Sequence, residues 1–257
     1  MIHFVGAGCG APDLITVRGL RLLENADCVV YAGSLVNKEL LDNCKEDTEI
    51  YNSATMTLEE VMEILVSRAK EGKNVVRLHT GDPSLYGAIS EQIEVLRKEG
   101  IDYDVTPGVT AAFGAAAAIG QELTLPGITQ TVIFTRVEGK TPMPPAESIR
   151  RLALHKSSMA IYLSATRAEE LKDQLLEGGY SIDTPVAICY KVSWEDEKII
   201  MSTIENMVTD TIDNELTLTT LYLVSNAINA KEFDKSRLYS EDFSTLYRKG
   251  SLDKEAE

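Results

Sequence analysis

Residues 2–13 read IHFVGAGCGAPD, an apolar run that leads directly into a loop with three glycines. The apolar part, Ile2–Val5, has the length of a strand that is buried on both faces. Glycines in the following loop allow backbone conformations and close approaches that other residues avoid. In α/β proteins ligands bind beyond the carboxyl ends of the strands. The stretch therefore predicts an α/β fold and indicates where its functional site lies.

The same alternation of strand and helix continues outward from this stretch. The predicted strands are Cys28–Tyr31, Thr48–Tyr51, Val75–Leu78 and Tyr103–Val105, and the predicted helices are Thr16–Glu24, Leu58–Lys70 and Leu85–Lys98. Thr57 and Glu60 have the spacing of a capping box, and Gly72 is a natural stop for the helix that they begin. This alternation predicts a mostly parallel sheet with helices on both faces.

The pattern breaks around Gly120–Thr129 and a second series follows. Its predicted strands are Thr131–Thr135, Ala160–Ser164, Val186–Val192, Lys198–Ser202 and Leu221–Ser225, and its predicted helices are Ala146–Leu154 and Ala168–Leu176. The short gap between Val192 and Lys198 favours an antiparallel pair, so the second sheet should be mixed. We expect two α/β domains, residues 1–120 and 121–235, and an acidic, solvated tail at 236–257 that is partly disordered.

Composition excludes several classes of function. The net charge is −15, with 40 acidic and 25 basic residues, which disfavours nucleic acid as a partner. No apolar run approaches the roughly 20 residues that a membrane helix needs, and the first residues lack a targeting pattern, so we expect a cytoplasmic protein. Four scattered cysteines without a C-x-x-C pair argue against a zinc site or a disulfide framework.

Two more loops resemble the first in composition. Residues 79–87 read HTGDPSLYG after the fourth predicted strand, and residues 106–112 read TPGVTAA after the fifth. Each loop alone is compatible with a simple turn, but three such loops at one sheet edge favour a ligand against the backbone. A nicotinamide-binding fingerprint fits less well, because the third glycine comes one residue early and no acidic residue ends the second strand.

These loops resemble those of the tetrapyrrole (corrin and sirohaem) methyltransferases. The matching strings are GAGCGAPDLIT at residues 6–16, GDP at 81–83 and PGVT at 107–110, in the family's order over nearly the whole chain. Cys9 and Ala11 depart from the residues that are frequent there. Three longer strings, at 31–36, 79–89 and 130–136, resemble the branch that methylates carbon 11 of precorrin-4 or cobalt-precorrin-4.

The resemblance implies a two-domain α/β homodimer that holds S-adenosylmethionine in a cleft between its domains. The cofactor-binding residues that it implies are Cys9, Gly81, Asp82, Thr110 and Ala111, with Leu163, Ala187 and Ser225 from the second domain. It implies a tetrapyrrole substrate and no metal held by side chains. The lack of a long apolar run separately leads us to expect no membrane partner. If carbon 11 becomes quaternary no proton leaves it, so no general base is needed and no catalytic residue is assigned.

Substrate carboxylates require local cations in an acidic protein. Arg136, Lys140 and Arg167 follow predicted strand ends, and an arginine can pair a carboxylate bidentately, which favours Arg136. Asp82 and Tyr86 are further candidates for substrate contact. His79 is either a hydrogen-bond donor in the cleft or a core histidine. The alternatives are methylation at another ring position or of a protein side chain, a nucleotide-dependent oxidoreductase, and a non-catalytic tetrapyrrole carrier.

Overall fold

The computed structural model of the chain describes residues 1–251, so the last six residues of the predicted acidic tail lie outside the described residues. The chain forms two compact units. The first contains residues 1–120 together with Ile188–Ile200 and Glu215–Leu221, and the second contains the rest. Because two later segments belong to the first unit, the chain passes between the units more than once. The predicted domain limits at 120 and 235 stay a prediction.

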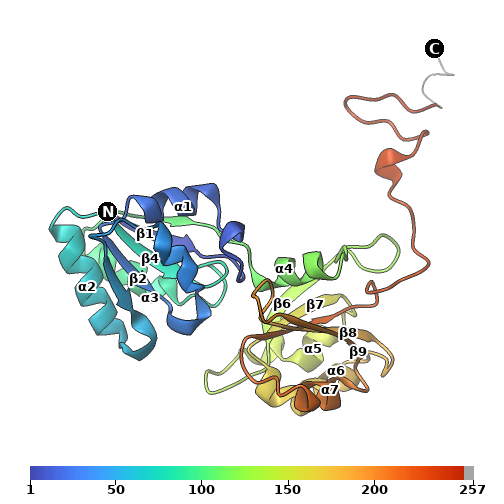
Figure 1. Ribbon diagram of the computed structural model, residues 1–257. Coiled ribbons are helices and arrows are strands. Elements are labelled where there is room, and N and C mark those ends of the chain that lie inside the picture. The colour runs from blue at the N-terminus through green and yellow to red at the C-terminus, as the bar shows by residue number, and fades with distance from the viewer. Residues whose placement is uncertain (252–257) are drawn as a thin grey trace. The chain divides into compact units, whose positions relative to one another are not determined.

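The first sheet has five parallel strands in the order β3-β2-β4-β1-β5. Three of them, β2, β4 and β1, are labelled in Figure 1. The strands are β1 (Ile2–Gly6), β2 (Cys28–Tyr31), β3 (Glu49–Asn52), β4 (Val75–His79) and β5 (Tyr103–Thr106). Gly6 pairs with His79 in the register of β1 and β4, so these two strands end at the same level. The carboxyl ends of β4, β1 and β5 are therefore neighbours, as the expected site requires.

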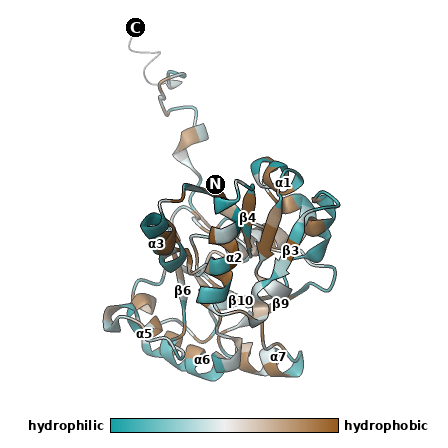
Figure 2. Cartoon of the chain, turned by 90° about the vertical axis from the view of Figure 1, so that its left-hand side faces the viewer, coloured by the Kyte–Doolittle hydropathy of each residue, from teal (hydrophilic) through white to brown (hydrophobic). Residues whose placement is uncertain are grey.

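Helices cover both faces of this sheet, as the sequence predicts. On one face Val5, Val29 and Val76 pack with Leu23 of α1 (Val17–Glu24) and with Leu40. On the other, Phe4, Val30 and Val75 pack with residues of α2 (Leu58–Lys70) and α3 (Ile89–Glu99). Figure 2 shows brown, apolar residues in the strands around β4 and largely teal, hydrophilic residues in α2. Each fully buried aliphatic side chain contributes about 1.5–3 kcal/mol to this packing.

Two predicted helix starts have different outcomes. The capping box is confirmed: Thr57 accepts from the Glu60 amide, and the Glu60 carboxylate accepts from the Thr57 amide. The third predicted helix begins at Ile89 and not at Leu85, so its first four residues were assigned wrongly. Tyr86 and Ala88 have φ angles of +57° and +50°, which no α-helix contains. The stretch instead forms a loop above β4.

The second sheet also has five strands, in the order β6-β7-β10-β8-β9. They are β6 (Val132–Arg136), β7 (Ser158–Tyr162), β8 (Pro185–Tyr190), β9 (Lys198–Thr203) and β10 (Thr220–Val224). β6 and β7 are parallel whereas β7 and β10 are antiparallel, so the sheet is mixed as predicted. Its helices are α5 (Ile149–Ala153), α6 (Ala168–Glu177) and α7 (Met207–Asp213). Within residues 1–251 no helix is long and apolar enough to cross a membrane.

Two helices were not predicted from the sequence. The helix α4 (Ala111–Ala118) consists almost wholly of alanine, so it carries no alternation of apolar and polar residues. The helix α7 has only seven residues and four of them are threonine or aspartate, which are weak helix formers. Met207 and Thr211 of α7 are buried, so tertiary packing stabilises this helix more than its own propensity does.

Candidate active site

The first two glycine-containing loops are joined through their backbones. Gly8 and Gly81 form an isolated antiparallel bridge, in which the Gly81 amide donates to the Gly8 carbonyl at 2.8 Å and the Gly8 amide donates back at 3.3 Å. The Ala7 amide donates to the His79 carbonyl at 2.7 Å. These bonds hold the loop after β1 against the loop after β4, and they satisfy backbone groups beyond the ends of both strands.

The third loop lies equally close to the first two. This close approach explains why glycine occupies positions 6 and 108. A Cβ atom on Gly6 would lie 2.6 Å from the Cα of Gly108 and 2.6 Å from the Gly81 carbonyl oxygen. A Cβ on Gly108 would overlap the same carbonyl oxygen. Any side chain at Gly6 or Gly108 would therefore push the three loops apart. The structure thus brings together the three loops that the sequence placed at one sheet edge.

Asp82 fastens the second loop to the third. Its Oδ2 accepts from the Gly108 amide at 2.9 Å, and its Oδ1 accepts from the Ser84 amide at 2.8 Å. Both carboxylate oxygens thus bind backbone amides of the chain itself, one within its own loop and one in the neighbouring loop. The side chain of Asp82 therefore holds the loops together, and its contact with a cofactor or substrate stays a prediction.

Cys9 lies in the first loop and contacts a segment that is almost 200 residues away in sequence. Its Sγ is 3.3 Å from the Ser193 Oγ, and its carbonyl oxygen accepts from the Trp194 Nε1 at 3.1 Å. The Ser193 Oγ also accepts from the Ala11 amide at 3.0 Å. We name residues 191–197 the clasp segment, because it holds the first loop from outside the sheet. Sequence reasoning missed it, since no motif marks these residues.

The clasp segment is itself braced by short-range contacts. The Glu197 carboxylate accepts from the Ser193 amide at 2.6 Å, and Lys191 forms an ion pair with Asp196 at 2.5 Å. The Lys191 ammonium also lies 5.9 Å from the centre of the Trp194 ring. Lys191 and Ser193 both have positive φ angles, which indicates a backbone shaped by these contacts and not by local preference.

His79 ends β4 directly before the second loop and is only 4% exposed. Burial, together with the charge of Arg77, lowers the pKa of His79 to about 3, so the imidazole is neutral near pH 7. Its Nε2 has no hydrogen-bond partner within the described part of the chain. His79 is therefore a core histidine by burial, although one nitrogen is unsatisfied.

Arg77 is a buried cation two residues before His79. Burial lowers its pKa to about 10, which leaves the guanidinium charged at neutral pH. It donates from Nη1 to the Val30 carbonyl at 3.1 Å and from Nε to the Gln92 Oε1 at 3.4 Å. No carboxylate pairs with it within residues 1–251. The positive charge of Arg77 is thus uncompensated below the second loop.

Two other expected site residues of the first unit belong to the loops. Thr110 is the N-cap residue of α4 and Ala111 is the first residue of that helix, so both stand at the end of the third loop. The Cα of Thr110 lies 3.7 Å from the position of a Cβ on Gly81. Tyr86 lies in the loop after β4 and is 45% exposed. The loops thereby collect Cys9, Gly81, Asp82, Thr110 and Ala111 at one edge of the sheet.

The expected site residues of the second unit have varied surroundings. Leu163 follows β7, has a φ angle of +54° and is 69% exposed. Ala187 is fully buried in β8, and the Ser225 Oγ lies 2.7 Å from the Ser158 Oγ in the core. Ala187 and Ser225 could reach a ligand only through their backbones. The participation of these three residues in the site stays a prediction.

The three basic candidates also differ. Arg136 ends β6 and donates to the carbonyl oxygens of Val137, Thr141 and Pro142 at 3.0–3.4 Å. It has no acidic partner in residues 1–251, so its positive charge is uncompensated. Arg167 pairs with Glu170 at 3.1 Å, and Lys140 is exposed. Arg136 is thus the one candidate of the three whose guanidinium is held by hydrogen bonds and whose charge no acid within residues 1–251 neutralises.

Comparison with known proteins gives a consistent result over the full chain. The profile of the family described as Tetrapyrrole (Corrin/Porphyrin) Methylases matches residues 1–208. The chain is 49% identical to a cobalt-precorrin-4 C(11)-methyltransferase of Methanocaldococcus jannaschii, over 96% of both proteins. It is 41% identical to a precorrin-4 C(11)-methyltransferase of Pseudomonas aeruginosa, over 97% of this chain and 99% of that protein.

Solved structures agree with these relatives. The X-ray structure of a cobalt precorrin-4 methyltransferase superposes with a TM-score of 0.87 at 45% identity, covering 89% of this chain and 96% of the other. A uroporphyrin-III C-methyltransferase from Thermus thermophilus superposes with a TM-score of 0.73 at 28% identity, covering 91% and 97%. The predicted α/β fold class, with a mostly parallel first sheet and a mixed second sheet, is confirmed by these likenesses and by the strand pairing.

Proposed function

Since the chain belongs to the tetrapyrrole (corrin/porphyrin) methylases, we propose that it transfers a methyl group from S-adenosylmethionine to carbon 11 of a precorrin-4 ring. The family membership confirms the resemblance seen in the sequence. The observation that carries the proposal is the 49% identity, over 96% of both chains, to a protein named for this reaction. The relatives at 49% and 45% identity are named for the cobalt form and one at 41% for the metal-free form, which favours cobalt-precorrin-4.

The loops of the first unit fit the proposed cofactor. Apart from its chain neighbours, an added Cβ on Gly81 would have only the Thr110 Cα within 4 Å among residues 1–251, so the backbone has an open side there. The residues Ala111 and Ala112, which begin α4, have small side chains, so a ligand can approach the backbone there. We assign cofactor contact to Cys9, Gly81, Asp82, Thr110 and Ala111, together with Leu163, Ala187 and Ser225.

The protein's part in the reaction is to bind and to orient. S-adenosylmethionine supplies a methyl group that its sulfonium already activates, so the chain need not provide a nucleophile. Holding two reactants in line can be worth on the order of 7 kcal/mol. If carbon 11 becomes quaternary, no side chain has to remove a proton from it. The buried, neutral His79 is accordingly given no catalytic role.

The substrate's carboxylates require cations, and Arg136 is the best candidate because no acid within residues 1–251 neutralises it. Its bonds to three carbonyl oxygens hold the guanidinium in place, which reduces the entropy lost on binding. Tyr86 and Asp82 belong to the second loop and are proposed as neighbours of the substrate. We also propose that the chain forms a homodimer, as the family resemblance implies, and that it acts in the cytoplasm.

The proposal is tested by mapping the product. The purified protein is incubated with cobalt-precorrin-4 or precorrin-4 and with S-adenosylmethionine that carries a ¹³C-labelled methyl group. A new methyl signal on carbon 11 in the NMR spectrum is the expected result, with faster turnover of the cobalt form. A methyl group on another ring carbon would assign the chain to a different step of the same chemistry.

Binding measurements separate the other classes of function. We expect S-adenosylhomocysteine to bind with a micromolar dissociation constant in titration calorimetry, and NAD not to bind. Binding of NAD alone would favour an oxidoreductase. A protein that binds the tetrapyrrole but not S-adenosylhomocysteine would be a carrier, and the proposed reaction would be wrong.

A further inference from the structure

A pocket lies in the first unit, along α1 and away from the three loops. Its volume is about 500 Å³, and it is lined by His3, Val17, Arg18, Arg21, Leu22, Asn25 and Asn74. Pockets of about 300–1,000 Å³ are typical of small-molecule sites. His3 is the second residue of β1 and Asn74 directly precedes β4, so this end of the pocket lies at the amino ends of the strands. His3 is roughly 10 Å from Gly6, where the first loop begins.

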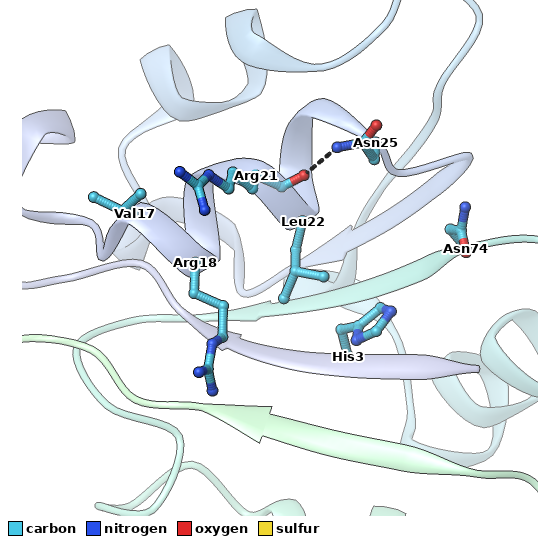
Figure 3. Close-up of a pocket in the computed structure, with 7 residues that line it drawn as sticks. All are labelled: His3, Val17, Arg18, Arg21, Leu22, Asn25 and Asn74. Carbon is cyan, nitrogen blue, oxygen red and sulfur yellow. Dashed lines mark hydrogen bonds between the residues drawn. The ribbon is translucent and has the colours of Figure 1, made fainter.

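Two arginines give the pocket its charge. Arg18 and Arg21 are exposed, and neither side chain has an ion pair or a hydrogen bond within the described part of the chain. They are three residues apart on α1, which places their Cβ atoms about 5–6 Å from each other. Figure 3 shows Arg18 and Leu22 pointing from α1 toward the strand that carries His3. The two guanidinium groups therefore raise the local potential within a chain of net charge −15.

The placement of Arg18 is unfavourable for the helix alone. It lies in the first turn of α1, where the helix dipole is positive and where acidic residues are usual, yet this turn has none. Two cations at a spacing of three residues also repel each other by a few tenths of a kcal/mol. Glu24 lies three residues after Arg21 but forms no ion pair with it within residues 1–251. A bound anion would relieve both repulsions.

His3 adds an oriented polar group. Its Nδ1 lies 2.9 Å from the Asp104 carboxylate, whose side chain is 45% exposed. That contact holds the ring, and Nε2 has no partner within the described residues. Arg18 and Arg21 carry two positive charges, against the one negative charge of the Asp104 carboxylate. Asn25 binds the Arg21 carbonyl through Nδ2 at 2.7 Å, which fixes its amide beside the pocket.

From these contacts we infer that the pocket along α1 binds a small molecule with at least two oxyanion groups, either carboxylates or phosphates. Arg18 and Arg21 would pair these groups, because a guanidinium donates to two oxygens of a carboxylate or phosphate at once. Leu22 and Val17 offer an apolar wall to the body of the ligand. This site is separate from the proposed cofactor site, and it does not depend on the proposed reaction.

The test titrates the full chain with pyrophosphate and with citrate by calorimetry, in about 50 mM salt where screening is weak. We expect one of the two to bind with a dissociation constant below about 1 mM, which identifies phosphate or carboxylate as the preferred group. The Arg18→Gln/Arg21→Gln double variant should bind at least tenfold more weakly. Arg151→Gln is the matched control, since Arg151 is also exposed and has no side-chain partner in residues 1–251.

Other outcomes overturn the inference. Absence of saturable binding, or an equal loss in Arg151→Gln, would mean that only general electrostatic attraction acts. The double variant should bind S-adenosylhomocysteine as the wild type does, and a parallel loss would contradict a separate site. If the double variant does not fold, the ring signals of His3 in the wild type, assigned with His3→Gln, should shift with pyrophosphate or citrate. Unchanged His3 signals would exclude this pocket.

Discussion

Asp82 connects two loops through hydrogen bonds to backbone amides of Ser84 and Gly108. In Asp82→Asn one acceptor oxygen becomes an NH₂ group, which faces an amide and leaves a donor unpaired. Such a change costs about 1–3 kcal/mol. We predict that S-adenosylhomocysteine binds about tenfold more weakly to this variant in titration calorimetry. Asp13→Asn, a change at an exposed acid near the first loop, should have no effect. Wild-type affinity in Asp82→Asn would contradict the role of Asp82 in holding the loops.

His79 should make the stability of the first unit depend on pH. Its pKa is about 3 in the folded protein against an ordinary value of 6.5, so the unfolded chain binds the proton first as the pH falls. Stability is therefore lost progressively below about pH 6.5, and at pH 5 the loss from this one group is about 2 kcal/mol. Urea unfolding of wild type and His79→Gln at pH 7.5 and pH 5.0 measures it.

The difference in unfolding free energy between wild type and His79→Gln should shift by this amount between the two pH values. His155→Gln provides the control, because His155 is exposed. If the pH dependence is the same in wild type and His79→Gln, the histidine is not buried as the structure has it.

At the scale of elements, the clasp segment joins the first loop to a part of the chain beyond β8. Trp194→Phe keeps an aromatic ring but removes the Nε1 bond to the Cys9 carbonyl. Loss of one such bond is worth about 0.5–1.5 kcal/mol, so we predict that S-adenosylhomocysteine binds about three- to tenfold more weakly. Glu195→Gln alters the charge of the same segment and should leave the affinity unchanged, because Glu195 is exposed and its side chain forms no ion pair or hydrogen bond within residues 1–251.

Trp194 is also the only tryptophan of the chain, so its fluorescence reports on this contact directly. Ligand binding at the first loop should change the emission of the wild type. An emission spectrum that does not respond to saturating S-adenosylhomocysteine, together with unchanged affinity in Trp194→Phe, would show that the clasp segment does not influence the site.

At the scale of the whole molecule, the proposed homodimer has to form between chains of net charge −15. Like charges repel, so the association must rest on apolar contacts, and large apolar side chains such as Phe113 and Leu218 are more than half exposed. Light scattering after gel filtration should give about twice the chain mass of 28.2 kDa. The dimer fraction should rise between about 50 and 500 mM salt, because salt screens the repulsion. A mass near that of one chain at every salt concentration would refute the dimer.

Local patterns were enough to predict much of the fold. The apolar run Ile2–Val5, the capping box at Thr57 and the alternation of strands with helices each depend on residues close in sequence. They failed where residues far apart decide the conformation. Leu85–Ala88 was predicted as helix but forms a loop, and α7 forms because its buried face packs against other elements. In the site, too, the loops were predictable from local sequence, whereas the contacts between them were not.

The sequence by itself determined the class of fold, the three glycine-containing loops and the family, because strand and turn preferences and motif order are local properties of the chain. Only the tertiary structure decided what the side chains in those loops do. Asp82 binds the amide of Gly108, Cys9 contacts Ser193, and Arg18 and Arg21 line a pocket with His3. The physical reason is that these contacts join residues far apart in sequence, and no local preference encodes such distances.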